Sequence, residues 1–368
     1  MQSRRDFLTR TTTAAAVGLS GTLGLSAMSR FDTAQAKPAS VMSGAARTPF
    51  GVAVRSDVLT TDAAYRAAIV ANCQMIVPEG EMKWPDVQPM RGEFRFEKAD
   101  AIVDFARQHQ IDVRGHTLAW YGGMPSWTND IKNRAEATRE LVGYIEKIVS
   151  RYRGVVPSWD VVNEPLIDFP RDMTSLRPCV WTKHLGVDYI PIVLRATAAT
   201  DPTTQLVLNE YDVEFEGPRY AARRKSLLQL LRTLRDNDVP LHAVGLQAHL
   251  FADRAIDRDG LQSFLAEILA LKLDILVTEL DVIDFELPGN IGERDALVAK
   301  KADQFLSAVY DVVRPKALLT WGLSDRYTWV PIYFKRPDGL LNRPLPFDAD
   351  YKEKPLFRVI DKYRRRVA

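Results

Sequence analysis

Short apolar runs alternate with longer amphipathic stretches along the chain, and this alternation repeats eight times. The short runs are rich in β-branched residues and end at polar or turn-forming residues, a pattern that favours buried strands over helices. The predicted strands are Phe50–Val54, Gln74–Pro78, Asp112–Leu118, Ser158–Asn163, Gln205–Asn209, Ala243–Ala248, Leu273–Thr278 and Ala317–Gly322.

The longer stretches have helical periodicity. The clearest predicted helices are Ala99–Gln108, Ala135–Tyr152, Val187–Thr200, Arg219–Asn237, Leu261–Ala270 and Arg294–Val312. Eight strand–helix units with continuously apolar strands predict a single-domain α/β fold, the (β/α)8 TIM barrel, in which helices cover every strand. An open doubly wound sheet is the alternative, but that fold more often has a glycine-rich turn after its first strand, and Val54-Arg55-Ser56-Asp57 has none.

The first 36 residues have the composition of an export signal. Arg4-Arg5 precede an apolar run of small residues, and Ala34-Gln35-Ala36 resembles a cleavage site. We therefore predict a twin-arginine-type signal at 1–36, a linker at 37–48 and a catalytic barrel at 49–368, in a periplasmic or secreted protein. A membrane anchor is the less favoured alternative, because glycines interrupt the apolar run and it falls short of the ~20 residues that a span needs.

The charge balance points to a neutral partner. The chain has 49 basic and 47 acidic residues, of which the first 36 positions hold four and two, so 45 of each remain. A chain without net charge has no electrostatic field that would attract nucleic acid or a membrane. We also expect a monomer. The two cysteines, Cys73 and Cys179, either form one disulfide or stay as separate thiols, and the sequence leaves this open.

Polar and aromatic residues follow the predicted strands. In a (β/α)8 barrel these strand ends meet at one rim, where active sites lie. Two glutamates, Glu164 and Glu279, end apolar runs, and a carboxylate there costs solvation energy unless it is used. Paired carboxylates are what hydrolysis of a glycosidic bond requires. The other rim residues are Glu79, Glu81, Lys83, Trp84, His116, Trp120, Asn163, Asn209, Tyr211, Gln247, His249, Asp281, Trp321, Asp325 and Trp329.

Several tryptophans at one rim suit a sugar, which has an apolar face and a hydroxyl edge. Core filling is the alternative for these aromatic residues, as a satisfied core histidine is for His249. The sequence has no His-Glu-x-x-His motif and no cysteine cluster, so we expect no metal and no cofactor.

Eight motifs in order resemble the family 10 glycoside hydrolases, the family of endo-β-1,4-xylanases, over the whole predicted barrel. They are FGVAV (50–54), PEGEMKW (78–84), RGHTLAW (114–120), WDVVNEP (159–165), LNEYD (208–212), GLQAHL (245–250), VTELDV (277–282) and WGLSD…W (321–329). The resemblance implies a retaining mechanism on xylan or xylo-oligosaccharides, with Glu164 as general acid/base and Glu279 as nucleophile. Physical reasoning agrees, because His249 and Asp281 are neighbours able to hold Glu279 ionised.

The resemblance also implies binding roles. Asn163 would bond the 2-hydroxyl of the sugar at the cleavage point, and Lys83 and His116 its 3-hydroxyl side. Trp120, Trp321 and Trp329 would form walls around that sugar. Gln247 and Asn209 would position the carboxylates, and Tyr211 belongs to the same shell of substrate-binding or supporting residues.

Two positions depart from the family pattern: Gly80 replaces an asparagine, and Gly123 stands where a glutamine is usual. By the resemblance both amides serve the next sugar toward the non-reducing end, and each lost hydrogen bond would cost about 1 kcal/mol. Tyr121 could fill part of the gap by stacking. The alternatives are therefore a related retaining barrel glycosidase acting on β-1,4-glucan or short xylo-oligosaccharides, and an inactive sugar-binding protein.

Overall fold

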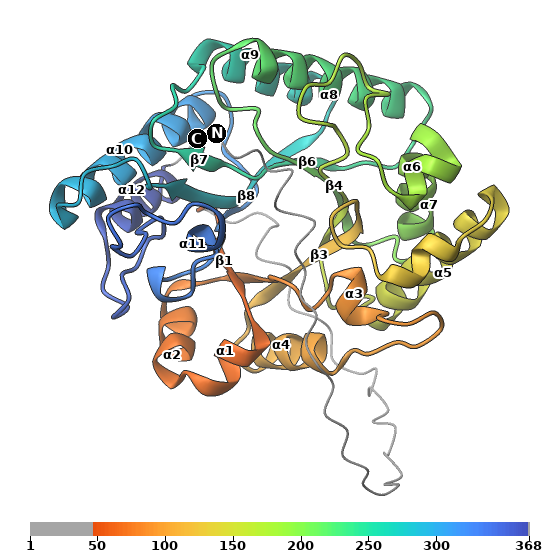
Figure 1. Cartoon of the computed structure of the whole chain (residues 1–368), viewed down its shortest axis with the longest axis horizontal. Coiled ribbons are helices and arrows are strands. Elements are labelled where there is room, and N and C mark those ends of the chain that lie inside the picture. Colours follow the sequence, from red (N-terminus) through yellow and green to blue (C-terminus); the bar gives the residue numbers. More distant parts are fainter. Residues whose placement is uncertain (1–46, 367–368) are drawn as a thin grey trace, which may run out of the picture. The chain divides into compact units, whose positions relative to one another are not determined.

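The computed structural model describes residues 47–366, which form a closed barrel of parallel strands surrounded by helices (Figure 1). The predicted signal at 1–36 and most of the predicted linker lie outside the described residues. The barrel strands are β1 (Phe50–Val54), β2 (Met75–Pro78), β3 (Asp112–Trp120), β4 (Ser158–Asn163), β5 (Gln205–Glu210), β6 (Ala243–Leu246), β8 (Asp274–Ile283) and β9 (Leu318–Thr320).

Pairing between the first and last strands and between β6 and β8 closes the sheet. Phe50 to Val52 of β1 lie opposite Leu318 to Thr320 of β9, and Ala243 to Leu246 lie opposite Asp274 to Val277. A short strand, β7 (His249–Phe251), follows β6 and pairs with the far half of β8. The predicted (β/α)8 barrel is therefore confirmed.

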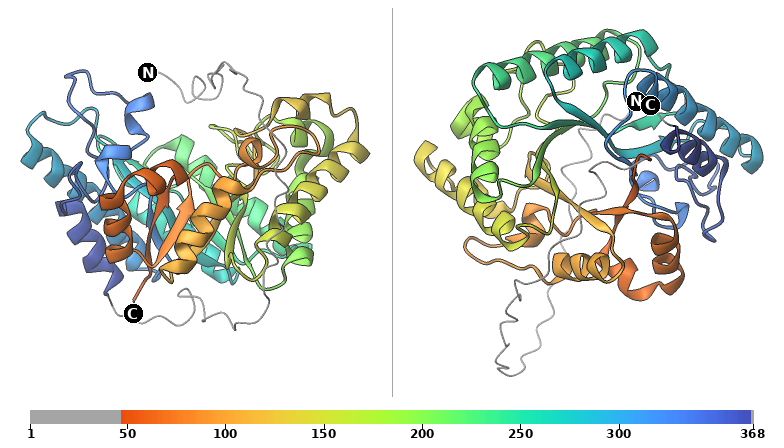
Figure 2. Two further views of the ribbon diagram at one scale, coloured as in Figure 1. Left: turned by 90° about the horizontal axis from the view of Figure 1, so that it is seen from below. Right: turned by 180° about the vertical axis from the view of Figure 1, so that it is seen from behind.

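The helices surround the strands, and Figure 2 shows the barrel from the side. The main helices are α2 (Ala63–Asn72), α4 (Glu97–Gln108), α5 (Arg134–Arg151), α7 (Tyr189–Thr200), α8 (Pro218–Asp236), α9 (Arg258–Ala270), α10 (Ile291–Tyr310) and α12 (Pro355–Arg364). Shorter helices are α1 (Ser56–Thr61), α3 (Trp84–Val87), α6 (Val180–Leu185) and α11 (Val330–Tyr333), with 3-10 turns at Ser126–Asp130, Gly186–Asp188 and Asp325–Tyr327.

Side-chain caps fix where several helices begin. The carboxylate of Asp257 accepts a hydrogen bond from the Gly260 amide at the start of α9, and Asn290 caps α10 through the Glu293 amide. Such caps satisfy amide groups that the helix itself leaves unpaired, each contributing about 1 kcal/mol.

The apolar core has two layers. The larger layer fills the space between the strands and the helices. A smaller one lies inside the barrel and includes Met75, Val207, Leu276, Leu319 and Trp321. Because Trp321 belongs to this inner cluster and also lies at the end of β9, the barrel filling continues into the site described below.

A backbone hydrogen bond joins the start of the barrel to its last helix. The Thr48 amide donates to the Arg364 carbonyl, which ties the start of the barrel to α12. Within residues 47–366 neither Cys73 nor Cys179 takes part in a disulfide, and Cys73 is buried. No described helix is long and apolar enough to cross a bilayer.

Candidate active site

Glu279 lies on β8 and is held by hydrogen bonds to both of its carboxylate oxygens. Oε1 accepts a bond of 2.6 Å from the Asn209 amide, and Oε2 lies 3.0 Å from His249 Nε2. The other ring nitrogen of His249 faces Asp281 at 3.0 Å. Burial alone would lower the pKa of His249, but the carboxylates of Asp281 and Glu279 outweigh it and raise that pKa to about 10. A cationic imidazole therefore faces Glu279 at neutral pH.

The orientation of the Asn209 amide follows from its partners. Thr278 Oγ1 donates to Asn209 Oδ1 at 2.7 Å, so Nδ2 of Asn209 points toward Glu279 and toward Asn163 Oδ1, 2.9 Å away. This arrangement requires a glycine on the next strand, because a Cβ atom at Gly245 would come within 2.2 Å of Asn209 Oδ1. The glycine of the GLQAHL motif thus makes room for the amide that orients Glu279.

Glu164 follows the last residue of β4 in the left-handed region, with φ of +52°. Its amide donates to the Asn209 carbonyl at 2.9 Å, which fixes this uncommon backbone. Its Oε1 accepts a bond of 3.0 Å from Gln247 Nε2, which also lies 3.3 Å from Asn163 Oδ1. The side-chain amides of Gln247, Asn163 and Asn209 therefore connect the two glutamates.

His116 is oriented by a buried carboxylate on the neighbouring strand, β4. Its Nδ1 lies 2.9 Å from Asp160 Oδ2, and Asp160 also forms a two-pronged ion pair with Arg114. Ligand atoms of His116, Asp160 and Glu279 lie within 4.8 Å of one another, a spacing that a metal ion could use. The Arg114 guanidinium accounts for the charge of Asp160 and would repel a cation there, so these residues fit a hydrogen-bond network better than a metal centre.

Lys83 and two indole rings lie together. The Lys83 ammonium lies 4.8 Å from the Trp120 ring centroid and 5.7 Å from that of Trp321. Trp329 donates from Nε1 to Asp281 Oδ2 at 2.7 Å, and its ring packs edge-on against His249. The predicted wall residues thus gather around Glu279 from the ends of β3 and β9, which is the arrangement that a sugar ring needs.

Tyr211 lies deeper than the other predicted residues. It is buried, and its hydroxyl donates to Asp168 at 2.9 Å and contacts Arg177. Arg177 also stacks on Tyr121, with its guanidinium carbon 4.5 Å from the ring centroid. Tyr211 therefore supports the loop that follows Glu164, and Tyr121 packs against the same loop.

Two rim residues from the sequence pattern belong elsewhere. Trp84 begins α3 and is buried, stacked 3.8 Å from Tyr144 and close to Trp181, so it does not line the wall. Asp325 bonds to Lys354 at 2.9 Å in a buried ion pair. Sequence reasoning also missed Arg114 and Asp160 as positioning residues, although charges inside two adjacent apolar strands were a usable signal.

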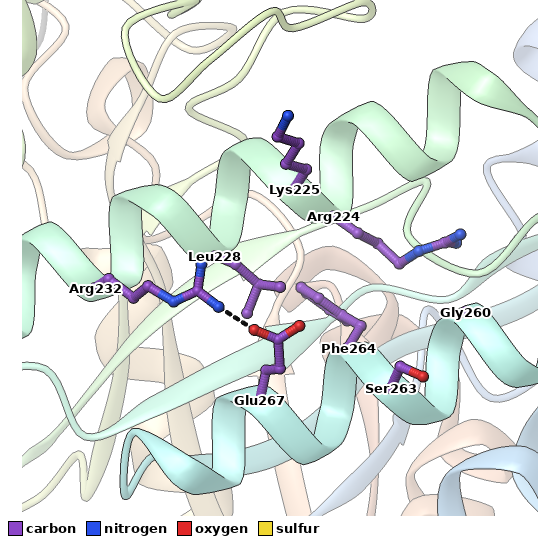
Figure 3. A pocket seen from close by; sticks show the side chains of 8 residues that line it. All are labelled: Arg224, Lys225, Leu228, Arg232, Gly260, Ser263, Phe264 and Glu267. Atoms are coloured by element: carbon purple, nitrogen blue, oxygen red, sulfur yellow. Dashed lines mark hydrogen bonds and ion pairs between the residues drawn. The ribbon is translucent and has the colours of Figure 1, made fainter.

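A hollow elsewhere on the molecule lacks comparable chemistry. It lies between α8 and α9 on the outside of the barrel, lined by Leu228 and Phe264 and flanked by the ion pair of Arg232 and Glu267 (Figure 3). Because its lining comes from α8 and α9 and not from the strand ends, the rim around Glu164 and Glu279 remains the candidate active site.

The fold is a parallel (β/α)8 barrel, and at its rim two glutamates lie between indole rings and are connected by hydrogen bonds through side-chain amides. These are the features of a glycoside hydrolase. The family model for glycosyl hydrolase family 10 matches residues 39–363. The chain belongs to this family.

Several curated and solved proteins are similar to the chain. Endo-1,4-beta-xylanase C of Phanerodontia chrysosporium is 32% identical over 334 residues, covering 89% of this chain and 79% of that protein. Endo-1,4-beta-xylanase A of the same organism is 33% identical, with 84% and 72% covered. Xylanase 10B of Thermotoga petrophila RKU-1, solved with xylobiose, superposes with a TM-score of 0.79 at 27% identity, covering 90% of this chain and 98% of that one.

Proposed function

We propose that the chain is a retaining endo-1,4-β-xylanase, which cuts the backbone of xylan through a covalent glycosyl-enzyme intermediate. The observation that carries this proposal is the pair Glu164 and Glu279, joined through three amides in a family 10 barrel. Its relatives among endo-1,4-β-xylanases support the choice of substrate.

In the first step Glu279 is the nucleophile. Its carboxylate oxygen forms a bond to the anomeric carbon while the bond to the leaving oxygen breaks, and Glu164 gives its proton to that oxygen. The role of Glu279 is supported by the donors around it, because Asn209 and the cationic His249 stabilise a carboxylate and hold it in one orientation.

In the second step the same groups act in reverse. Glu164, now a carboxylate, takes a proton from water as the water oxygen bonds to the anomeric carbon, and the bond to Glu279 breaks. Asn163 is placed between the amides of Asn209 and Gln247, a position that supports a bond to the 2-hydroxyl. His116 and Lys83 would hold the 3-hydroxyl side.

Two measurements test this function. Purified protein should release reducing sugar from xylan much faster than from carboxymethyl-cellulose, and NMR should show the β-anomer as the first product from a xylo-oligosaccharide. Faster release of reducing sugar from the β-1,4-glucan would favour the alternative function, a related glucanase. The two amides missing at Gly80 and Gly123 are the reason for considering this alternative. An absence of release from both polymers would indicate a sugar-binding protein.

We propose in addition that the protein acts outside the cytoplasm, in the periplasm or the medium. Arg4-Arg5 and the small-residue run after them support this, as does a polymeric substrate that cannot enter a cell intact. Fractionation of cells that express the full chain tests it, and replacing both arginines by lysine should leave the protein in the cytoplasm. An unchanged distribution would contradict a twin-arginine route.

A further inference from the structure

A buried ion pair lies behind the loop that begins with Glu164. Glu210 is the last residue of β5, and Arg223 lies on the inner face of α8; they are 1% and 0% exposed. Arg223 Nη1 lies 3.0 Å from Glu210 Oε1. Taking two charges out of water costs free energy that their attraction does not reliably return, so such a pair is weak evidence for stabilisation. The pair therefore points to another task.

Both members of the pair bind the loop that follows Glu164. Glu210 Oε2 accepts a hydrogen bond of 3.3 Å from the Leu166 amide, two positions after Glu164. Arg223 Nη2 donates to the Ile167 carbonyl at 2.9 Å, and Nη1 lies 3.5 Å from the Leu166 carbonyl. The pair thus satisfies the amide and the carbonyl of one residue and the carbonyl of the next, which fixes the path of the backbone away from Glu164.

The end of β5 also holds Glu164 through two other contacts. The Asn209 carbonyl accepts from the Glu164 amide, and the Glu210 carbonyl accepts from the Gln247 amide, both at 2.9 Å. Gln247 in turn donates from Nε2 to Glu164 Oε1 at 3.0 Å. Since Glu164 has a φ of +52°, which a residue with a side chain adopts only where its surroundings hold it, these contacts are needed together.

The charges of Glu210 and Glu164 act on each other as well. Burial raises the pKa of Glu210, Arg223 acts against this rise, and the charge of Glu164 adds to it. Repulsion between like charges is mutual, so a charged Glu210 favours the protonated form of Glu164. A general acid must start in that form.

We propose that Glu210 and Arg223 are positioning residues for the general acid: the pair fixes the backbone from Glu164 to Ile167 and thereby the direction in which Glu164 gives its proton to the leaving oxygen. This inference rests on the proposed function. Both residues are too buried to reach the substrate, so they act through Glu164. Their loss should therefore slow only those cleavages that need a proton on the leaving group.

The leaving group provides the readout. A dinitrophenyl xylobioside loses an acidic phenol that needs no proton, whereas a phenyl xylobioside depends on the general acid, and kcat/KM for both reports the steps up to the glycosyl-enzyme. Glu210→Gln combined with Arg223→Met removes both charges and leaves neither unpaired. We expect this double variant to lower kcat/KM about tenfold on the phenyl substrate and less than about twofold on the dinitrophenyl substrate.

The matched control is a second Arg–Glu pair that also starts from α8. Arg232 and Glu267 form an exposed ion pair with α9 on the outside of the barrel (Figure 3). Arg232→Met combined with Glu267→Gln makes the same chemical changes there, and kcat/KM should stay unchanged on both substrates.

Arg223→Lys decides the question where the double variant does not fold. It keeps the positive charge beside Glu210 but replaces the fork that reaches Leu166 and Ile167 by a single ammonium group, so the same selective loss is expected. Equal losses on both substrates in a folded variant would mean that the pair only stabilises the barrel, and unchanged kcat/KM on both would mean that Glu164 is held without it. Either result would overturn the positioning role, whereas a wild-type protein that cleaves neither the xylobiosides nor xylohexaose would remove the proposed function itself.

Discussion

His249 Nε2 lies 3.0 Å from Glu279 Oε2, and the opposite ring nitrogen lies 3.0 Å from Asp281 Oδ1. One histidine thus joins two carboxylates, and it is held as a cation by both. Since its folded pKa of about 10 exceeds the ordinary value of 6.5, its contribution to stability is fully present below about pH 6.5 and is lost as pH rises through about 10.

Replacing this cation should slow the chemical step. We expect His249→Gln to lower kcat by about 100-fold, because the variant loses a charged donor to the nucleophile, whereas KM should change less. Steady-state kinetics on xylohexaose measure both. His109→Gln, at an exposed position, is the control. A rise in KM with unchanged kcat would mean that His249 stabilises the bound substrate and the transition state equally. His249 would then not act through Glu279.

The two glutamates should respond differently to removal. Glu279→Ala should abolish turnover on every substrate, because no nucleophile remains. Glu164→Ala should lose activity on xylan but keep it on aryl xylobiosides with an acidic phenol, whose leaving group needs no proton. Equal losses for both variants on the aryl substrate would show that the division of roles is wrong.

Gly245 should behave as a positioning residue although it has no side chain. A Cβ atom would approach Asn209 Oδ1 to 2.2 Å, so Gly245→Ala must displace the amide that bonds Glu279. We expect kcat to fall more than tenfold, with KM changing less. Gly143→Ala adds the same methyl group to an exposed helix position as a control.

A second readout separates displacement from unfolding. Asn209→Ala would remove the amide that Gly245→Ala displaces, so the double variant should lose little more kcat than either single variant. If the losses in kcat were additive, Gly245→Ala would act by lowering the stability of the whole fold. A Gly245→Ala protein with low kcat but a melting temperature within a few degrees of wild type would exclude this explanation.

The strand pattern predicted the barrel well because each buried strand leaves a local signal. All eight predicted strands overlap observed ones, yet the run Ala243–Ala248 ends early at Leu246. Ala248 has φ of +59°, so the backbone turns there before β7 begins. That turn depends on pairing with β8, which no local pattern encodes.

The site was predicted from the ends of strands. The residues that this prediction placed wrongly or missed have one cause in common. Trp84 follows β2 as a wall residue would, but it stacks on Tyr144, sixty positions away in α5. Asp160 lies within a strand, so its contact with His116 requires the register between β3 and β4. Both depend on packing between distant segments, whereas Glu164 and Glu279 are marked by their own neighbours in sequence.

Glu214, outside the catalytic pair, offers a test of stability. It is fully buried, and neither carboxyl oxygen has a hydrogen-bond partner within residues 47–366. Burial, and to a lesser degree the charge of Asp212, raises its pKa to about 7 from an ordinary value of 4.5. The folded state therefore retains a proton that the unfolded state releases between these pH values, and stability falls as pH rises through this window.

Glu214→Gln should remove this pH dependence while it keeps the shape of the side chain. Relative to wild type, the free energy of unfolding of the variant should improve by about 3 kcal/mol between pH 4.5 and pH 8, because wild type alone must ionise a buried carboxyl group. Urea denaturation at both pH values measures this difference. Glu216→Gln, two positions on and exposed, should show little change with pH. If both variants gave the same small difference, Glu214 would have to reach solvent or a partner when it ionises.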